Sequence, residues 1–451
     1  FQMNDALYIL SFLVKYLNLD AFWEDIIWHV CRENKDCFLG SMVEAQLEIY
    51  GTAPYKQKRM LHRKNVRNFM QALNLPDGRS REQEKNKKRI VIMTEQLLSI
   101  KHAPTLITLE FAYILQEKMN YEVCIITFPL DYHLPFDLWV DPRYYYGGFE
   151  GVRDIPYKGV KIRNIGFSME DGSLDRCSRM LHMIAVWKPW LVLELGVTNP
   201  LADLCREFTA TVAMAMTTEC PVSEADILIR YVPGTGAYEE ACKKELLPRQ
   251  KQIFMQEKLP VIAQEAEKEC VPDELGLPEG KFFVAVVGNR LDLEIDEAFL
   301  NIMKQIMDAA ENVDFAVIGD AEKLQEKLAG TSYGKRIHFL GYCMDLPGTY
   351  RALHLYLNPR RLGGGWSSAM ALMAGLPVVT LPACDVAYNV GGEFTVTTEE
   401  EMVDAVIRYA SDDVFYAQKK QIAIEKGRDG GEQKMLEYVT SLFTRIQENV
   451  E

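Results

Sequence analysis

The sequence lacks the short signatures by which many metal-dependent and phosphate-binding proteins are identified. It contains no HExxH motif, no P-loop, no kinase motif set and no Asp-x-Asp at the end of an expected strand. Its ten cysteines are scattered, without a CxxC pair or any other clustered metal spacing. Scattered cysteines are typical of reduced thiols inside the cell, whereas a zinc site or a disulfide framework needs clustering. We therefore expect a cytoplasmic protein with no metal and no bound cofactor.

Basic residues are also fewer than acidic ones. The 64 Asp and Glu residues outnumber the 50 Lys and Arg residues, which leaves a net charge of −14. A protein that grips nucleic acid by its phosphates needs the opposite balance, so we expect no nucleic-acid partner. Residues 54–89 are the exception, with 12 Lys and Arg and 3 acids. This stretch is either a solvated helix face and linker or a contact for an acidic acceptor, a second copy or a partner subunit.

Long apolar runs that could span a membrane are missing as well. Residues 363–384 carry no charged side chain, but Gly375, Pro377 and Pro382 divide them into a turn, a short helix and a strand. The first apolar stretch of the chain is interrupted by Lys15 and Asp20, so we expect no secretory signal.

Length and periodicity indicate several domains. A chain of 451 residues exceeds the size of about 250–300 residues at which single cores stop growing. Residues 1–87 show apolar spacing typical of helices, and we expect an all-helical module there that contributes to acceptor binding. Strand and helix patterns then alternate, which predicts βαβ units around parallel sheets. We predict an α/β fold with two tandem Rossmann-like domains, residues 88–245 and 246–432, and a C-terminal helix at 433–451.

Apolar runs bounded by turn residues define the expected strands of each domain. In the first domain they cover 89–94, 121–129, 189–195, 210–216 and 225–231. In the second they cover 282–288, 314–320, 336–341, 353–358 and 376–381. Ligands of such sheets bind beyond the carboxyl ends of the strands, so we expect the catalytic and ligand-binding residues in the loops that follow these strands.

The most informative of these loops follows the strand that ends at Asn358. Three consecutive glycines, Gly363, Gly364 and Gly365, precede a helix that begins near Trp366. The first N–H groups of a helix have no partner inside the helix and carry the positive end of its dipole, and glycines let an anion approach them closely. Ser367 and Ser368 add hydroxyl groups. The segment therefore has the properties of a diphosphate cradle.

The same helix carries a recognisable pattern. Ser367-Ser368 and the run Leu372-Met-Ala-Gly-Leu-Pro-Val-Val-Thr380 resemble the donor-binding loop and helix of glycosyltransferases with the two-domain GT-B fold. The nearest pattern is that of family 41, the O-GlcNAc transferases and bacterial cytoplasmic N-glycosyltransferases. The resemblance spans residues 89 to about 430, although its motifs are short. It implies transfer of a hexose or N-acetylhexosamine from a nucleotide-sugar, which we expect to be UDP-linked, to a protein side chain with inversion at the anomeric carbon.

The resemblance also implies roles for two charged residues. GT-B enzymes place a Lys or Arg after the first strand of the second domain, against the donor diphosphate, and Arg290 follows Asn289 at that place. The alternative is an exposed loop arginine. His102, in Lys-His-Ala-Pro-Thr, resembles the family's His-Pro-Thr loop and could act as a base. Equally, it could cap the helix that begins at Pro104.

We therefore assign catalytic roles to His102 and Arg290. The residues expected to bind the donor are Gly363, Gly364, Gly365, Trp366, Ser367, Ser368, Asn289 and Asp385. Two roles are possible for Asp385: it contacts the ribose or sugar, or it caps a short helix. Arg360 and Arg361 are secondary candidates for the phosphates.

One position departs from the GT-B pattern. Where these enzymes carry an Asp or Glu for the ribose hydroxyls, five residues before Gly375, this chain has Met370. A rival interpretation is therefore a non-catalytic GT-B homologue that binds an acceptor or a partner subunit. A second rival is a nucleotide-sugar epimerase of the same fold. Family 4 is not favoured, since its Glu-x7-Glu pattern is missing around 362–370.

Overall fold

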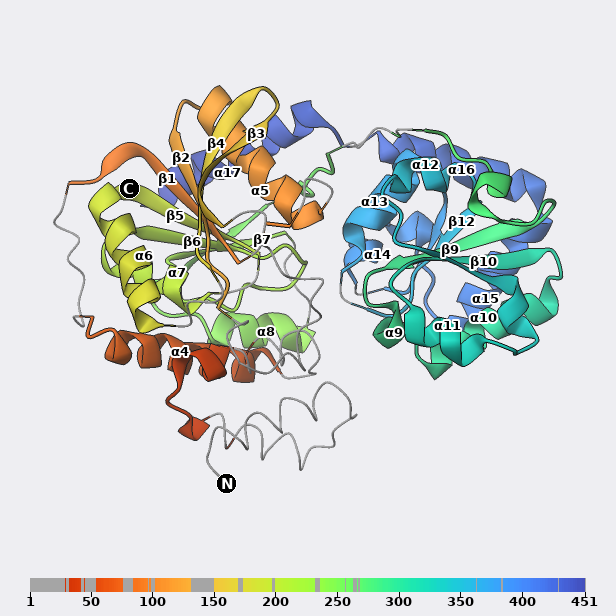
Figure 1. Ribbon diagram of the computed structural model, residues 1–451, viewed down its shortest axis with the longest axis horizontal. Coiled ribbons are helices and arrows are strands. Elements are labelled where there is room, and N and C mark those ends of the chain that lie inside the picture. Colours follow the sequence, from red (N-terminus) through yellow and green to blue (C-terminus); the bar gives the residue numbers. More distant parts are fainter. Residues whose placement is uncertain are drawn as a thin grey trace. The chain divides into compact units, whose positions relative to one another are not determined.

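The chain forms two compact units, and each is considered by itself in this computed structural model (Figure 1). Unit 1 is Phe1–Glu257 with Val439–Glu451, and unit 2 is Lys258–Tyr438. The residues that the structure describes are 29, 32–41, 44, 54–75, 84–95, 97–98, 102–130, 150–168, 173–196, 199–231, 236–255, 257–262, 266, 268–361, 363–382, 384–428 and 430–450. The aromatic loops at 131–149, and most of the helical pattern in the first 50 residues, lie outside them.

Unit 1 is built on a sheet with the strand order β3-β4-β2-β1-β5-β6-β7-β8. Neighbouring strands are parallel except for the hairpin β3–β4 at one edge. The strands are β1 (Asn86–Thr94), β2 (Glu122–Thr127), β3 (Gly151–Tyr157), β4 (Val160–Gly166), β5 (Pro189–Leu195), β6 (Ala210–Met214), β7 (Ile227–Arg230) and β8 (Lys251–Phe254). The central strand β1 buries five consecutive residues, as expected for a parallel strand covered on both faces.

Helices cover the two faces of this sheet (Figure 1). They are α4 (Tyr55–Ala72), α5 (Ala103–Tyr113) with its π-helical end η1 (Ile114–Lys118), α6 (Leu174–Trp187), α7 (Pro200–Leu204) with η3 (Cys205–Glu207), and α8 (Gly236–Lys244). Val66 and Phe69 of α4 are fully buried in one apolar cluster with Val91 and Met93 of β1. Helix α4 is therefore a layer of the first domain, whereas the sequence pattern predicted a separate module for residues 1–87.

Unit 2 has a smaller parallel sheet with the order β11-β10-β9-β12-β13. Its strands are β9 (Phe282–Gly288), β10 (Val313–Gly319), β11 (Ile337–Gly341), β12 (Leu355–Leu357) and β13 (Val378–Val379). Its helices are α9 (Leu291–Glu294), α10 (Glu297–Ala309), α11 (Glu322–Leu328), α12 (Leu346–Tyr350), α13 (Gly365–Met373), α14 (Asp385–Val390), α15 (Glu399–Ser411) and α16 (Asp413–Gly427), with short 3-10 turns η4 (Pro272–Leu275), η5 (Tyr333–Arg336) and η6 (Gly392–Phe394). Two apolar clusters fill the two faces of the sheet.

The last helix, α17 (Glu432–Val450), belongs mainly to unit 1. Lys251 Nζ donates to Asn449 O at 2.6 Å, and Arg445 Nη1 donates to Phe254 O at 2.5 Å. Both contacts anchor the helix on β8, a strand that the sequence pattern did not predict. Because β8 pairs with β7, the first unit extends to Glu257, twelve residues beyond the expected boundary at 245.

The predicted α/β class with two parallel-dominated sheets is confirmed. The antiparallel hairpin β3–β4 is an addition that the sequence pattern missed. Among the described residues, no helix combines the length and apolarity that a membrane crossing requires. The same residues contain no cluster of three or more His, Cys, Asp or Glu with the spacing of a metal site.

The strand orders locate one reversal point in each sheet. In unit 1 the chain moves outward from β1 to β2 and then returns to β5 on the other side of β1. In unit 2 it moves from β9 through β10 to β11 and returns to β12 beside β9. Loops that leave neighbouring strands in opposite directions open a crevice at their carboxyl ends, where ligands of such folds bind. The loops after β1, β9 and β12 therefore lie where ligands of this fold bind.

Candidate functional site

The glycine turn lies at the reversal point of the unit 2 sheet, after β12. Gly363 and Gly364 have φ angles of +89° and +80°, which L side chains rarely adopt. At Gly364 a side chain would also collide, because a Cβ there would lie 2.8 Å from Arg361 Nη2. Gly364 is the N-cap residue of the nine-residue helix α13. The three glycines thus form a sharp turn that only this residue type can make so tightly.

Two side chains of α14 hold this turn in place. Asp385 Oδ2 accepts a hydrogen bond from the Gly363 N–H at 2.8 Å, and Asn389 Nδ2 donates to Gly365 O at 2.7 Å. The N-cap of α14 is Cys384, whose Sγ accepts from the Ala387 N–H. Asp385 is therefore not the helix cap that the sequence left open, and its carboxylate orders the glycine turn. The contacts of Asp385 and Asn389 join residues more than 20 positions apart, so no local sequence pattern predicts them.

The second strand at the reversal point, β9, contributes Arg290. A Cβ on Gly363 would lie 3.8 Å from Arg290 Nη2, so the guanidinium group reaches the glycine turn. Arg290 Nε donates to Glu294 Oε1 at 3.1 Å, and its side chain remains 37 % exposed. Asn289, the residue before it, is exposed at the end of the strand. The structure thus brings together Arg290 and the glycine loop, as the sequence predicted.

Arg361 has a different task from the phosphate contact considered for it. Its side chain is 5 % exposed and donates to Glu294 Oε2, Val287 O, Tyr356 Oη and Asn358 Oδ1 at 2.6–3.0 Å. These contacts tie the loop after β12 to the end of β9. Arg360 instead lies at the surface, 3.7 Å from Glu399. Glu294 was missed in the sequence, although it pairs with both Arg290 and Arg361 and so sets the position of each.

The side chains at the start of α13 point mostly into the protein. Ser367 Oγ donates to Gly364 O at 3.0 Å and Ser368 Oγ donates to Gly365 O at 2.9 Å. Ser368 is fully buried. Trp366 packs against an apolar cluster of unit 2, and its Nε1 atom is buried with no hydrogen-bond partner among the described residues. The hydroxyl groups expected to bind the nucleotide-sugar therefore donate to carbonyls of the glycine turn instead. The hydrogen-bond donors that remain are the N–H groups of the backbone.

These backbone N–H groups give the start of the helix the properties that an anion site requires. The Ser368 N–H bonds to Gly364 O, while the N–H groups of Gly365, Trp366 and Ser367 have no acceptor within the described part of the chain. The first N–H groups of a helix carry partial positive charge, and Arg290 adds a full positive charge beside them. A phosphate or diphosphate is the natural ligand for this combination.

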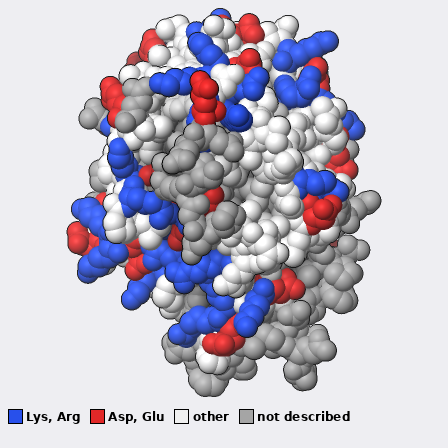
Figure 2. Space-filling view, turned by 90° about the vertical axis from the view of Figure 1, so that its left-hand side faces the viewer, with Lys and Arg blue, Asp and Glu red and all other residues white. Residues whose placement is uncertain are grey.

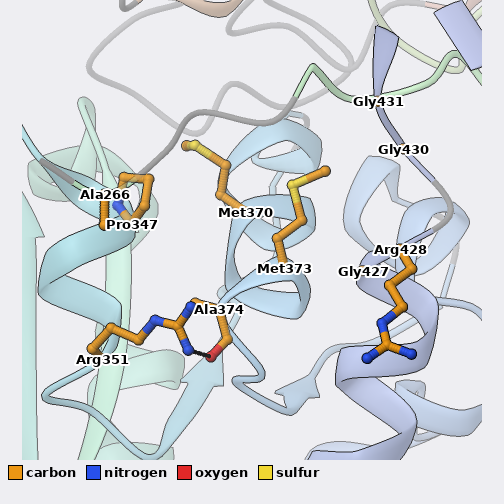
Figure 3. Close-up of a pocket in the computed structure, with 10 residues that line it drawn as sticks. All are labelled: Ala266, Pro347, Arg351, Met370, Met373, Ala374, Gly427, Arg428, Gly430 and Gly431. Carbon is orange, nitrogen blue, oxygen red and sulfur yellow. Dashed lines mark hydrogen bonds between the residues drawn. The ribbon is translucent and has the colours of Figure 1, made fainter. Parts of the chain in front are cut away.

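Met370 lines a separate cavity on the flank of α13. The cavity has a volume of about 390 Å³, and its walls also include Met373, Arg351 and Arg428. Figure 3 shows Met370 and Met373 leaving the same helix face, with Arg351 donating to Ala374 O at 3.4 Å. Met370 itself is 7 % exposed and packs in the apolar cluster. A ribose at this face of the helix would meet thioether and methyl groups where GT-B enzymes offer a carboxylate.

His102 lies at the other reversal point, in the loop after β1 of unit 1. It is the N-cap residue of α5, with its carbonyl accepting from the Leu106 N–H at 2.9 Å, but its ring makes no capping bond. The ring Nδ1 instead lies 3.1 Å from Thr105 Oγ1, which also accepts from the Leu98 N–H at 2.8 Å. Burial lowers the pKa of His102 to about 4, so the imidazole is neutral near pH 7. His102 thus occupies the N-cap position through its backbone, while a role of its ring as a base stays a prediction.

A buried polar cluster next to this point was only partly foreseen. Glu194, at the end of β5, is 3 % exposed and accepts from the Asn199 N–H. Asn199 Nδ2 donates to Glu95 Oε1 at 3.2 Å and to Phe128 O at 3.0 Å. The cluster joins the carboxyl ends of β1, β2 and β5. Thr198, three residues beyond the apolar run 189–195 of the sequence, is outside the described residues.

Comparison with known proteins agrees with this geometry. Residues 283–412 match a family described as "Glycosyl transferases group 1". No curated protein sequence matches. Among solved structures, an O-GlcNAc transferase mutant from Thermobaculum terrenum is 14 % identical, with a TM-score of 0.66 over 99 % of this chain and 84 % of that one.

Two further structures contain nucleotides. Anabaena HepE in complex with UDP-glucose is 12 % identical, with a TM-score of 0.54 over 79 % of this chain and 99 % of that one. The pneumococcal O-GlcNAc transferase GtfA, in complex with UDP and GlcNAc, is 9 % identical, with a TM-score of 0.51 over 81 % and 100 %. The chain therefore has the GT-B fold of glycosyltransferases.

Proposed function

We propose that this GT-B protein transfers a sugar from a UDP-sugar to a protein side chain without a metal ion. The observation that carries the proposal is the glycine turn at the start of α13, with Arg290 beside it at the reversal point of the unit 2 sheet. A cationic side chain and unpaired backbone N–H groups neutralise the charge that develops on a departing diphosphate, which is the task a divalent cation performs elsewhere. Structural similarity to proteins solved with UDP and UDP-glucose supports the choice of uridine nucleotide.

We assign the acceptor's proton to His102. A neutral imidazole can accept a proton from an attacking hydroxyl, and the lowered pKa of about 4 keeps the ring neutral at every pH near 7. Thr105 contacts the ring at Nδ1, so we assign the acceptance of the proton to Nε2. Resemblance to family 41 supports a protein acceptor and inversion at the anomeric carbon.

We place the reaction in the cytoplasm. Nine cysteines of the described chain form no disulfide bond, and six of these are buried. Thiols of this kind suit a reducing compartment, where a protein glycosyltransferase meets newly made acceptors and cytoplasmic sugar nucleotides.

The first test is a thermal-shift panel with UDP, GDP and ADP. A ligand at 100 times its Kd adds about 2.7 kcal/mol to the unfolding free energy, so binding raises Tm by several degrees. UDP should shift the wild type, and Arg290→Ala should reduce the shift. Arg408→Ala is the matched control, because Arg408 is an exposed arginine on α15 of the same unit. Absence of any shift at millimolar nucleotide, or an equal loss in both variants, would sink the proposal.

A second candidate function is favoured by one observation, the apolar surroundings of Met370. A GT-B homologue without a ribose carboxylate can serve as a partner subunit that binds an acceptor and leaves transfer to another protein. Met370→Glu separates the two interpretations. If the apolar face already suits the nucleoside, a buried carboxylate there weakens UDP binding. If the site has lost its ribose contact, Met370→Glu creates a UDP-induced shift that the wild type lacks.

A further inference from the structure

Helix α4 of unit 1 has an unusual charge content. Its eighteen residues include six Lys and Arg and no Asp or Glu. Figure 2 shows a face of the molecule on which Lys and Arg side chains gather in the lower half. The cations of α4 nevertheless differ in what they touch, and only some of them are available to a partner.

Most of these cations have partners within unit 1. Arg59 is fully buried and donates to Gln250 Oε1 at 2.8 Å. Arg63 lies 3.4 Å from Glu224 and 3.3 Å from Glu245, and Lys58 lies 3.5 Å from Glu219. These contacts fasten α4 to the segments that follow β6 and α8. They account for much of the basic sequence as a docking face, but they do not involve Lys56 or Arg67, both of which are exposed.

Arg67 is exposed and makes no ion pair or hydrogen bond within the described part of the chain. It stands at the edge of a cavity of about 410 Å³. The other walls are the aliphatic side chains of Met70, Leu75 and Leu247 together with Gln71, Arg206, Glu224 and Arg249. An exposed arginine beside an apolar pocket is an arrangement that a soluble surface does not need for its own stability.

The charge of the cavity is positive at its mouth. Glu224, its only acid, is neutralised from two sides, because Arg206 Nη1 donates to Oε2 and Arg63 Nε lies 3.4 Å from Oε1. Arg249 is exposed and donates to the Glu224 carbonyl at 3.3 Å. Two exposed guanidinium groups, those of Arg67 and Arg249, therefore flank an aliphatic floor. A carboxylate on a short apolar stem, with an apolar neighbour, fits this surface in both charge and polarity.

We propose that this cavity, the α4 pocket, binds an acidic segment of a protein partner in which carboxylate side chains alternate with apolar ones. Charge complementarity carries the choice of partner, because a net charge of −14 repels long polyanions while a local pair of arginines attracts a single acidic segment. The inference deepens the proposed function, on which it rests for the identity of the partner as the acceptor protein. The α4 pocket would then select the acceptor, and the nucleotide site would be separate from it.

The test uses the full chain and a short fluorescein-labelled peptide of alternating Glu and Leu, followed by fluorescence anisotropy at low salt. Wild-type protein should bind this peptide and should bind a Gln-Leu version at least about tenfold more weakly. Arg67→Glu and Arg249→Glu should each weaken binding of the Glu-Leu peptide about tenfold. Arg67 is at the surface, so Arg67→Glu should keep the wild-type Tm, and the Tm of Arg249→Glu is measured beside it because Arg249 also donates to Glu224 O. Arg179→Glu is the matched control, since Arg179 is an exposed arginine on α6 of the same unit.

Three results would overturn the inference. One is equal binding of the Glu-Leu and Gln-Leu peptides. Another is a loss in Arg179→Glu as large as that in Arg67→Glu, which would mean unspecific attraction. The third is displacement of the peptide by inorganic phosphate at millimolar concentration, which would mean a small-anion site. The peptide experiment contains no sugar nucleotide, so its result does not depend on the thermal-shift test with UDP. Peptide binding together with no UDP-induced rise in Tm would reject the proposed function and retain the α4 pocket.

Discussion

The two units share one topological feature but place different side chains at it. Each sheet reverses beside its first strand, at β1 in unit 1 and at β9 in unit 2. After β1 the chain provides a neutral imidazole, that of His102, and a buried polar cluster of Glu95, Glu194 and Asn199 joins the ends of β1, β2 and β5. After β9 it provides a guanidinium group and a tight glycine turn. One crevice therefore suits a group that loses a proton, and the other suits a group that gains negative charge.

This difference follows from how each loop is supported. The unit 2 turn is held by contacts between its own backbone and Asp385 and Asn389, so backbone N–H groups remain as ligands. The unit 1 loop is held by Thr105, which leaves a side chain as the reactive group. A fold of duplicated domains can thus divide acid–base work and anion binding between its halves. A substitution in either unit should therefore impair one of these two roles and leave the other intact.

The largest effect is expected at the unit 1 reversal point. His102→Gln should lower the rate of transfer about a thousandfold, because a general base contributes about 10²–10⁴-fold. The UDP-induced rise in Tm should persist, since His102 belongs to unit 1 and the anion site to unit 2. Transfer is measured as UDP release with an acceptor present. A variant that loses the UDP shift together with its activity would contradict the separation of roles.

The unit 2 reversal point should show the converse pattern. Gly364→Ala places a side chain at φ +80°, with its Cβ 2.8 Å from Arg361 Nη2. Strain of about 1–3 kcal/mol should displace the turn and weaken UDP binding about tenfold or more. Isothermal titration with UDP measures the loss.

Gly392→Ala is the matched control for this variant. Gly392 lies in the same unit, has no positive φ, and a Cβ there would meet nothing within 4 Å. Its affinity for UDP should equal that of the wild type. Equal weakening by the two substitutions would show that UDP binding reports general stability and not the geometry of the glycine turn.

Periodicity and local motifs made part of this architecture predictable. Buried parallel strands such as β1 and β9 show as continuous apolar runs, and the three glycines before α13 identify a backbone anion site within a single segment. The hairpin β3–β4 was missed because Arg153, Asp154, Lys161 and Arg163 hide its alternation. The edge strand β8 is only four residues long, too short for a periodic signal.

The rest of the site depends on contacts between distant residues. Glu294 meets Arg361 across 67 positions, and Asp385 meets Gly363 across 22. His62 lies in the basic stretch 54–89 of the sequence, yet it is fully buried between Glu44 and Asp203, each at 2.5 Å. Such pairings follow from tertiary packing, and no local pattern in the sequence encodes them.

The smallest effect is expected in the pH dependence of the unfolding free energy, to which His102 contributes through its charge. His62 of the same unit serves for comparison. Burial lowers the pKa of His102 to about 4. Burial would also lower the pKa of His62, but Glu44 and Asp203 outweigh it and raise that pKa well above its usual range. The two histidines belong to the same unit, so they predict opposite dependence of its unfolding free energy on pH.

The signs follow from which state binds the proton. Below pH about 6.5 the unfolded chain protonates His102 while the folded chain does not, so its contribution to stability is lost as pH falls towards about 4. For His62 the folded state keeps the proton, so its contribution is present below pH about 6.5 and is lost as pH rises. Urea unfolding of wild type, His102→Gln and His62→Gln over this range measures both slopes. His102→Gln should flatten the acid limb and His62→Gln the alkaline limb, and an unchanged acid limb in His102→Gln would mean that the unit 1 crevice is charged and not neutral.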